Sequence, residues 1–182
     1  KFENMRTFFL LQLYIVFCHS HIIGQPWDRI FGISGRIDVF ENLSGTYDGG
    51  FILLGAYDYF PDTRGWLIKV DINGNLLYDI TMGINNGFDQ INLPLSINQT
   101  LDGGNIICNV QGPDYLGNIG VIKLDQCGNL DWCRIFDTQD DPDWGVEIKQ
   151  LGDGGYIMLT MGYDYAFNNP RTHLFRLNEN GE

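Results

Sequence analysis

The residues whose type and spacing could do chemistry form an aspartate–tyrosine pair that occurs three times. The pairs are Asp58-Tyr59, Asp114-Tyr115 and Asp164-Tyr165. A ring of such pairs on one loop face could bind a glycan or a protein, because tyrosine rings stack and carboxylates accept hydrogen bonds. The alternative is structural, with the aspartate capping its loop and the tyrosine packing between repeats. The structural role is favoured because the pair repeats, whereas binding residues tend to differ between repeats.

Three further segments could carry chemistry, and each has a structural alternative. Residues 71–75 resemble a calcium loop, but that loop needs a glutamate at its twelfth position, and here strand residues follow at once. We therefore expect a hairpin turn. His173 has no nucleophile or carboxylate motif near it, so we expect a packing role. The acidic segment 140–143 could contribute to a cation site, but a solvated surface turn is the favoured interpretation.

The sequence has no motif typical of a catalytic, metal or cofactor site. Gly-x-Ser-x-Gly, His-Glu-x-x-His and the phosphate-binding loop are all missing from it. We therefore expect no catalytic residue, no metal ligand and no cofactor. The formal net charge of −12 and the pI near 4.4 also argue against nucleic acid as a partner, because nucleic acid is bound mainly by Lys and Arg.

The cysteines leave two interpretations open. Cys127 and Cys133 flank a predicted tight turn, so a disulfide across this hairpin is plausible in an exported protein. The alternative is that both, together with Cys108, stay unpaired. Cys108 lies in an apolar run, which predicts a small buried strand residue.

The elements that must position these residues come from an internal repeat. Asp-Gly-Gly begins at Asp48, Asp102 and Asp153, at spacings of 54 and 51 residues. A second landmark follows each copy in the same order, and it occupies residues 66–75, 120–129 and 173–182. Two landmarks in fixed order, three times over, indicate three structural repeats. Their approximate bounds are 37–82, 90–136 and 145–182.

Each repeat divides into four short strands, A to D. Asp-Gly-Gly and Asn-Gly type turns favour hairpins, because Gly and Asn tolerate positive φ. The predicted A strands are residues 37–44, 90–98 and 145–150, and the predicted D strands are residues 76–82 and 130–136. The B strands follow Asp-Gly-Gly, and the C strands precede the second turn. Four strands in about 50 residues predict an all-β fold, a partial β-propeller of about three four-stranded antiparallel blades. A β-solenoid has shorter coils, and isolated hairpins are marginally stable.

The two ends of the sequence suggest a fragment of a larger ring. Residues 27–32 resemble the D strand at 132–137 but precede the first A strand, so we expect an orphan outer strand there. The sequence stops inside the third repeat, at Gly181-Glu182. Because propellers usually have 4–8 blades, we expect an N-terminal fragment, with downstream blades of the same chain as partners.

The N-terminus is typical of a secretory signal peptide. Met5-Arg6 precedes an apolar run at residues 8–17 and a small-x-small site at 18–20. The run is too short for a transmembrane segment. We expect a signal peptide over residues 5–20, with an alternative cleavage site before Gln25, and translated upstream sequence at residues 1–4. The domain that follows, at 21–182, is then secreted or at the cell surface.

The repeat resembles a known family. Thr-x-Asp-Gly-Gly-(Tyr/Phe)-Ile, followed by (Leu/Ile)-Ile-Lys-(Val/Leu)-Asp-x-x-Gly-Asn-Leu, is similar to bacterial secreted propeller repeats of the delta-sixty and quinoprotein-like type. The resemblance covers residues 27–182 and implies a propeller, often followed by a type IX secretion sorting domain. Asp125, Gly128 and Trp132 match the quinoprotein-like hairpin, whereas the first copy has Tyr78 in the Trp position. No residue matches a quinone site.

Three functions remain open from the sequence. The first is a secreted or cell-surface module that binds a glycan or a protein without catalysis. The second is the propeller of a secreted enzyme, a hydrolase or a quinoprotein-like oxidoreductase, whose active residues lie in blades outside this sequence. The third is a structural spacer. We favour the first.

Overall fold

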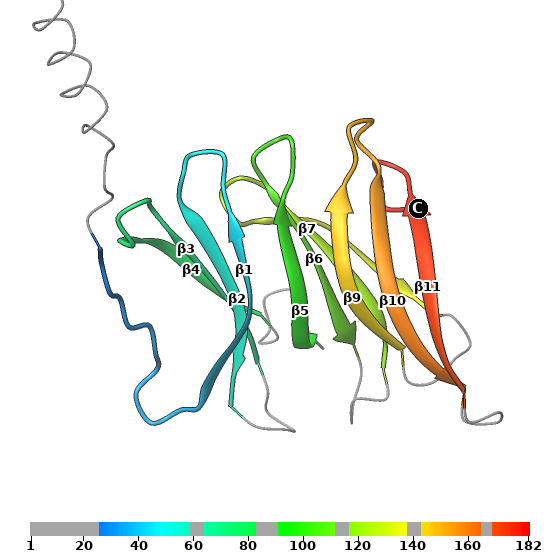
Figure 1. Cartoon of the computed structure of the whole chain (residues 1–182), viewed down its shortest axis with the longest axis horizontal. Helices are drawn as coiled ribbons and strands as arrows, with labels where there is room; N and C mark the ends of the chain where they lie inside the picture. The colour runs from blue at the N-terminus through cyan, green and yellow to red at the C-terminus, as the bar shows by residue number, and fades with distance from the viewer. Residues whose placement is uncertain (1–25, 59–63, 83–90, 112–116, 138–142, 165–168) are drawn as a thin grey trace, which may run out of the picture.

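The fold consists of β-strands that pair in chain order. The computed structural model describes residues 26–58, 64–82, 91–111, 117–137, 143–164 and 169–182. Within these ranges it has strands and no helix, so no described segment offers a helix long and apolar enough to cross a membrane. The strands form three antiparallel sheets, named here blades 1, 2 and 3 (Figure 1).

The strand bounds follow the repeat. Blade 1 contains β1 (Asp38–Gly45), β2 (Phe51–Tyr57), β3 (Arg64–Val70) and β4 (Leu76–Met82). Blade 2 contains β5 (Ile91–Gln99), β6 (Asn105–Gln111), β7 (Asn118–Leu124) and β8 (Leu130–Phe136). Blade 3 contains β9 (Asp143–Gln150), β10 (Tyr156–Asp164) and β11 (Asn169–Leu177). The predicted all-β fold of the partial propeller type is confirmed.

The glycine turns all lie at one end of the blades, at the top of Figure 1. The two glycines of Asp-Gly-Gly have different tasks, as blade 2 illustrates. Gly103 has φ +84°, a conformation that L side chains rarely adopt. Gly104 instead faces the neighbouring strand, and a Cβ there would lie 2.2 Å from the carbonyl oxygen of Leu124. Neither glycine can therefore be replaced without cost, which explains why the motif recurs unchanged. We call this end of the molecule the turn end.

The hydrophobic core lies between the blades. Adjacent strand residues point to opposite faces of a sheet, so Ile106 packs toward blade 3 and Ile107 toward blade 1. The first interface, between blades 1 and 2, includes Ile52, Leu54, Ile97 and Ile107. The second interface, between blades 2 and 3, has its own cluster, in which Cys108, Val121, Tyr156 and Met158 are buried. Because blade 2 is covered on both faces, β6 and β7 are buried almost throughout, unlike β8, in which exposed and half-buried residues alternate.

Two expectations from the sequence are wrong. Residues 26–33 do not form a strand, although they resemble β8. They instead run along the outer face of blade 1, where Phe31 and Ile33 pack on its apolar residues. Asp143 is also not a solvated loop residue, because it begins β9 and is buried. The other residues of the acidic segment, 140–142, lie outside the described ranges.

Candidate functional site

An ion pair links each Asp-Gly-Gly turn to the same position on strand C. In blade 1 the Nζ of Lys69 donates to Oδ1 of Asp48 at 2.8 Å, and in blade 2 the Nζ of Lys123 donates to Oδ2 of Asp102 at 2.8 Å. Both lysines are buried, with exposed fractions of 6% and 3%. A buried ammonium needs a partner because desolvation of an unpaired charge is costly. The pairs therefore hold each turn against its own sheet.

The aspartates of these turns are stabilised in the charged form. Hydrogen bonds from Lys69 and Thr46 lower the pKa of Asp48 well below its usual range. Burial opposes ionisation of Asp102, but hydrogen bonds from Lys123 and Thr100 outweigh it and lower the pKa to about 2. Shifted carboxylates can mark an active site. Here each shift is explained by groups of the same blade, which indicates a structural role.

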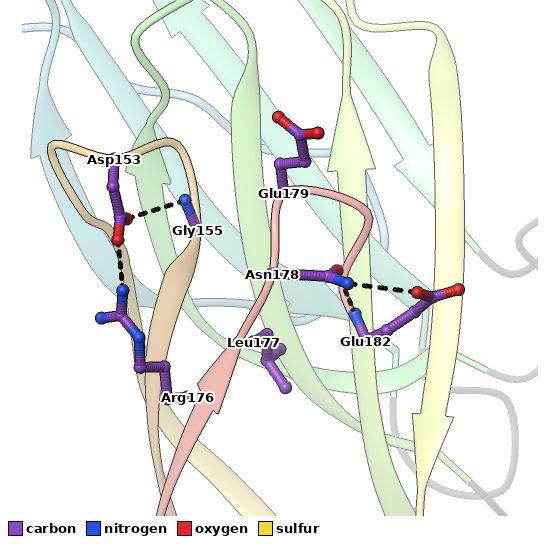
Figure 2. Close-up of a pocket in the computed structure, with 7 residues that line it drawn as sticks. All are labelled: Asp153, Gly155, Arg176, Leu177, Asn178, Glu179 and Glu182. Carbon is purple, nitrogen blue, oxygen red and sulfur yellow. Dashed lines mark hydrogen bonds and ion pairs between the residues drawn. The ribbon is translucent and has the colours of Figure 1, made fainter.

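The third Asp-Gly-Gly turn also forms an ion pair with strand C, but its cation is an arginine instead of a lysine. Figure 2 shows Asp153 between the backbone N–H of Gly155, at 3.1 Å, and the guanidinium of Arg176. A depression of about 590 Å³ lies beside them. Asp153 and Arg176 are both largely exposed, and the described residues that line this depression carry no buried polar atom lacking a partner. This depression is therefore an open surface rather than a built site.

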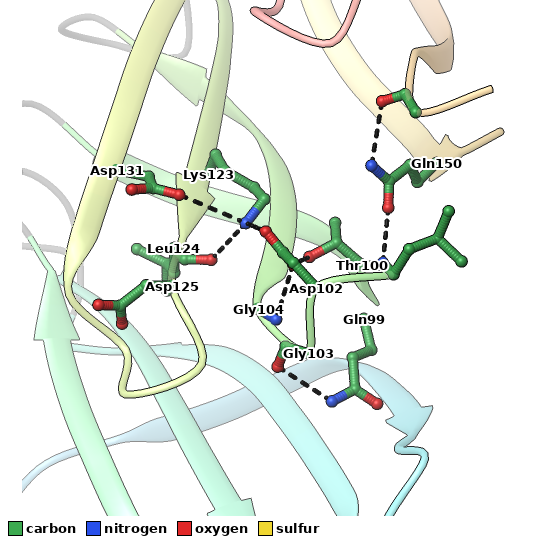
Figure 3. A network of polar contacts seen from close by, with 12 residues as sticks. Gln99, Thr100, Asp102, Gly103, Gly104, Lys123, Leu124, Asp125, Asp131 and Gln150 are labelled. Atoms are coloured by element: carbon green, nitrogen blue, oxygen red, sulfur yellow. Dashed lines mark hydrogen bonds and ion pairs between the residues drawn. The ribbon is translucent and has the colours of Figure 1, made fainter. Parts of the chain in front are cut away.

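Two glutamines connect neighbouring blades at the turn end. The Oε1 of Gln150 accepts from the backbone N–H of Leu101 at 2.7 Å, and its Nε2 donates to the carbonyl of Gly154 at 3.0 Å (Figure 3). Gln99 repeats this arrangement at the first interface, between the N–H of Tyr47 at 2.6 Å and the carbonyl of Gly103 at 3.1 Å. The glutamines fix the spacing of adjacent turns, and blade 1 has Gly45 at the equivalent position.

The calcium-like segment is a hairpin turn, as predicted. The Oδ1 of Asp71 accepts from the N–H groups of Asn73 and Asn75, each at 2.8 Å, and its Oδ2 accepts from the Asn75 side chain at 2.9 Å. Asp125 makes the same contacts in blade 2. Both carboxylates are occupied by their own turns. Throughout the part of the chain that the structure describes, no three His, Cys, Asp or Glu residues are grouped to hold a metal ion.

Residues from strand D of one blade and strand B of the next meet at both blade interfaces, and the outer face of blade 1 has an equivalent contact. At the second interface, Trp132 of β8 packs against Tyr156 of β10, with ring centroids 5.7 Å apart at an interplanar angle of 74°. On the outer face of blade 1, Trp27 packs against Phe51 at 6.3 Å. Trp27 also lies over Gly74, as Trp132 lies over Gly181. Residue 27 therefore occupies the place of a strand D aromatic, although its segment is not a strand.

The first interface breaks this pattern. Tyr78 of β4 takes the place of Trp132, and Asn105 of β6 takes the place of Tyr156. A hollow of about 270 Å³ lies there, and we call it the first hollow. Its wall includes polar residues from both blades: Tyr47, Asp48, Lys69, Tyr78, Gln99, Asn105 and Gln126. The smaller amide side chain leaves the space that an aromatic ring fills elsewhere.

Asn105 is the distinctive group of the first hollow. Its exposed fraction is 1%, yet its Oδ1 has no hydrogen-bond partner. Burial raises the pKa of Tyr78, and a hydrogen bond with the Asn105 side chain opposes this rise. The Asn105 amide thus lies beside the phenol, while its oxygen is buried without a partner. A buried polar oxygen without a partner is unusual in a folded protein and requires an explanation.

Of the Asp–Tyr pairs the structure describes Asp58 and the backbone of Asp164, which lie at the opposite end of the blades. Asp58 is described: its φ is +63°, its N–H donates to the carbonyl of Ile37 at 3.0 Å, and its carboxylate pairs with Arg36. The guanidinium of Arg36 in turn covers the ring of Tyr57 at 4.8 Å. These contacts stabilise the loop. Tyr59, Asp114, Tyr115 and Tyr165 lie outside the described residues, and Asp164 is described only in its backbone, at the end of β10.

The disulfide suggested between Cys127 and Cys133 is not formed. Both are free and exposed thiols, and Cys108 is a free thiol buried in β6. Cys127 lies in the β7–β8 turn, whereas Cys133 pairs with Ile122 farther along the hairpin. Cys133 is three residues beyond Leu130, roughly 10 Å along the strand, whereas a disulfide needs Cα atoms within about 7 Å. His173 stacks on Phe175, in agreement with a packing role.

Neither protein families nor curated proteins offer this chain a relative to argue from. No protein-family model matches it, and no curated protein is significantly similar to it. The first hollow is therefore a candidate site on its geometry alone. Sequence reasoning missed it, although a signal was there: aligned repeats place Phe51, Asn105 and Tyr156 at one position, and the asparagine is the polar exception.

Proposed function

We propose that this chain is a propeller module of a secreted or cell-surface protein, and that it binds a glycan or a protein without catalysis. The resemblance to bacterial secreted propeller repeats and the signal-like N-terminus support the location. The proposal places the ligand at the turn end, near the first hollow, rather than at the Asp–Tyr pairs.

One observation carries the proposal. Equivalent positions at the outer face of blade 1 and at the second interface hold aromatic pairs, whereas the first interface holds Tyr78 and Asn105 around a hollow. Features that recur, namely the turn aspartate paired with a cation of strand C in each blade and the glutamine links at both interfaces, serve the scaffold. A feature that differs in one blade is where a binding module would place its specificity.

A binding experiment with the full chain tests this function. The purified protein is passed over immobilised cell-surface polysaccharides and glycoproteins, with serum albumin as the blank. We expect saturable binding that weakens when Tyr47 at the mouth of the first hollow is changed to Ala. The matched control is Leu101→Ala, which removes the equivalent exposed side chain at the second interface. Failure of the unmodified chain to bind any of these surfaces would overturn the proposal.

A further inference from the structure

The face of blade 3 that points away from blade 2 carries apolar side chains whose counterparts in blade 2 are buried. Leu159 and Leu174 have exposed fractions of 36% and 68%. Their counterparts in the repeat, Cys108 and Val121, are both at 0% because blade 3 covers them. The depression of Figure 2 lies on the same face, at positions that form the first hollow where blade 2 follows blade 1. Blade 3 therefore presents a face that a further blade can cover.

The outer face of blade 1 presents the other half of such an interface. Leu43 has an exposed fraction of 64%, whereas its counterparts Ile97 and Ile148 are at 0% because each packs on the preceding blade. An apolar groove of about 230 Å³ lies beside Leu43. Its wall includes Phe31 of the N-terminal segment and Leu53 of β2. A blade packed on this face would bury Leu43 as its counterparts are buried.

Residues 27–32 lie where strand D of a preceding blade would lie. Trp27 covers the β3–β4 turn in the way that Trp132 of β8 covers the turn after β11. Within the part of the chain that the structure describes, residues 27–32 make no hydrogen bond between backbone groups, so their main chain can still pair with a strand. β11 is the edge strand of blade 3, on the side where β8 joins β7 in blade 2. The two elements therefore have the edges through which a strand C and a strand D pair.

We propose that two copies of this chain join head to tail, so that blade 3 of each copy packs on the outer face of blade 1 of the other and β11 gains residues 27–32 of the other copy as a fourth strand. The contact repeats the first and second interfaces and does not depend on the proposed ligand-binding function. Head-to-tail contacts form closed rings where the rotation permits. Two copies with three described blades each give six blades, the only multiple of three within the usual range of about 4–8.

A second copy is the occupant that the observations favour, because one chain carries both halves of the contact. The halves cannot meet within one copy, since blade 2 separates blade 1 from blade 3 (Figure 1). One link of the other interfaces is missing, because Gly45 stands where Gln99 and Gln150 connect neighbouring blades. Each copy also has a formal charge of −12, so the copies repel each other. We therefore expect a reversible association that added salt strengthens.

Sedimentation velocity of the full chain measures this association. At a chain concentration of about 10 µM we expect a dimer, and its fraction should rise with salt concentration. Leu43→Glu and Leu174→Glu each place a carboxylate in one half of the contact, at a side chain that is exposed in the single copy. Each should weaken association by about tenfold or more, because a carboxylate would be buried without a partner. Leu101→Glu is the matched control, since Leu101 is 61% exposed at the turn end, and it should leave the dimer intact.

Disulfide trapping tests the strand pairing. Val121 pairs with Arg134 in blade 2, and the equivalent pair across the proposed contact is Leu174 of one copy and Arg29 of the other. Residues that pair across adjacent strands lie within reach of a disulfide. The double variant Arg29→Cys with Leu174→Cys should therefore form a covalent dimer when diamide is added as oxidant.

The trapping experiment needs a background and a control. Cys127 and Cys133 are exposed thiols, so both are changed to Ser. Asp28→Cys with Leu174→Cys is the control, because a shift of one residue turns the side chain to the other face of the strand. It should form far less covalent dimer. Circular dichroism confirms that every variant keeps the β-sheet content of the unmodified chain.

Three outcomes would overturn the inference. A chain that stays monomeric at every salt concentration would leave both faces to a different protein. Dimers that survive both glutamate variants, or that are lost in only one of them, would place the contact elsewhere or show one face packing on itself. Equal trapping by the two cysteine pairs would exclude the proposed pairing of β11 with residues 27–32.

Discussion

The indole of Trp132 and the phenol ring of Tyr156 meet edge to face across the second interface, with centroids 5.7 Å apart. At the first interface the same two positions hold Tyr78 and Asn105, and the ring contact is replaced by a hollow. The second interface is therefore filled by two aromatic rings, whereas Tyr78 and Asn105 at the same positions leave the first interface with a hollow.

The aromatic pair should stabilise the second interface. Tyr156→Asn copies the residue that blade 2 has at this position and removes a buried ring, so we expect a loss of about 3 kcal/mol in the free energy of unfolding. Urea unfolding followed by tryptophan fluorescence measures it. Tyr47→Asn, at a largely exposed tyrosine, should change stability by less than about 0.5 kcal/mol. Equal effects of the two variants would contradict the role given to the pair.

The Asp102–Lys123 pair should respond asymmetrically to the loss of either partner. Asp102→Ala removes the hydrogen bonds to Thr100 and Gly104 and leaves a buried ammonium with the Leu124 carbonyl and with Asp131 at 3.6 Å. We expect a cost of about 2 kcal/mol. Lys123→Met leaves a carboxylate that is largely exposed and still bonded to its turn, so the cost should stay below about 1 kcal/mol. Urea midpoints compare them, and a larger cost for Lys123→Met would refute this account.

Substitutions of the turn glycines should distinguish the cost of a positive φ from the cost of a steric clash. Gly104→Ala places a Cβ 2.2 Å from the Leu124 carbonyl oxygen, so we expect severe destabilisation, of about 3 kcal/mol or more. Gly103→Ala meets no atom closer than 3.7 Å but requires positive φ, at a cost of about 1 kcal/mol. Gly152→Ala has open space and ordinary φ, so its thermal midpoint should be unchanged or higher. The order of the three midpoints is the test.

The lowered pKa of Asp102 predicts a loss of stability in acid. Its pKa falls from 3.8 to about 2 on folding, so the charged form is favoured in the folded state. Its contribution is fully present above the unfolded value and is lost as pH falls through the folded value. The stability difference between the unmodified chain and Asp102→Asn should therefore shrink between pH 5 and pH 2. Urea titrations at several pH values measure it, and a constant difference would show that the carboxylate charge does not matter.

The local parts of the fold were predictable from the sequence. Asp-Gly-Gly and Asn-Gly turns depend on residues that lie within a few positions of each other, and the contacts of Asp71 and Asp125 are made inside their own turns. Strand alternation and length likewise depend on neighbours along the chain. The Lys–Asp pairs could not be predicted, although both residues recur in the first two repeats. Each pair joins a turn to the neighbouring strand C, and which residues meet there depends on how the strands are aligned.

The non-local parts were decided by packing. The sequence predicted a strand at residues 27–32, but a strand forms only where another strand offers unpaired backbone groups. Residues 26–33 lie instead on the face of blade 1, where Trp27 reaches Gly74. The Cys127–Cys133 bridge failed for a related reason, since nearness in sequence did not bring the two Cα atoms within reach.

The sequence by itself determined three repeats, their strands, their turns and the all-β class, because these follow from local backbone preferences and from the periodicity of apolar residues. Only the tertiary structure decided which face of each blade meets which neighbour. That decision brings Tyr78 of one repeat to Asn105 of the next and leaves a hollow between them. The physical reason is that cavities and unpaired polar atoms depend on side-chain volume across an interface, which no single repeat contains.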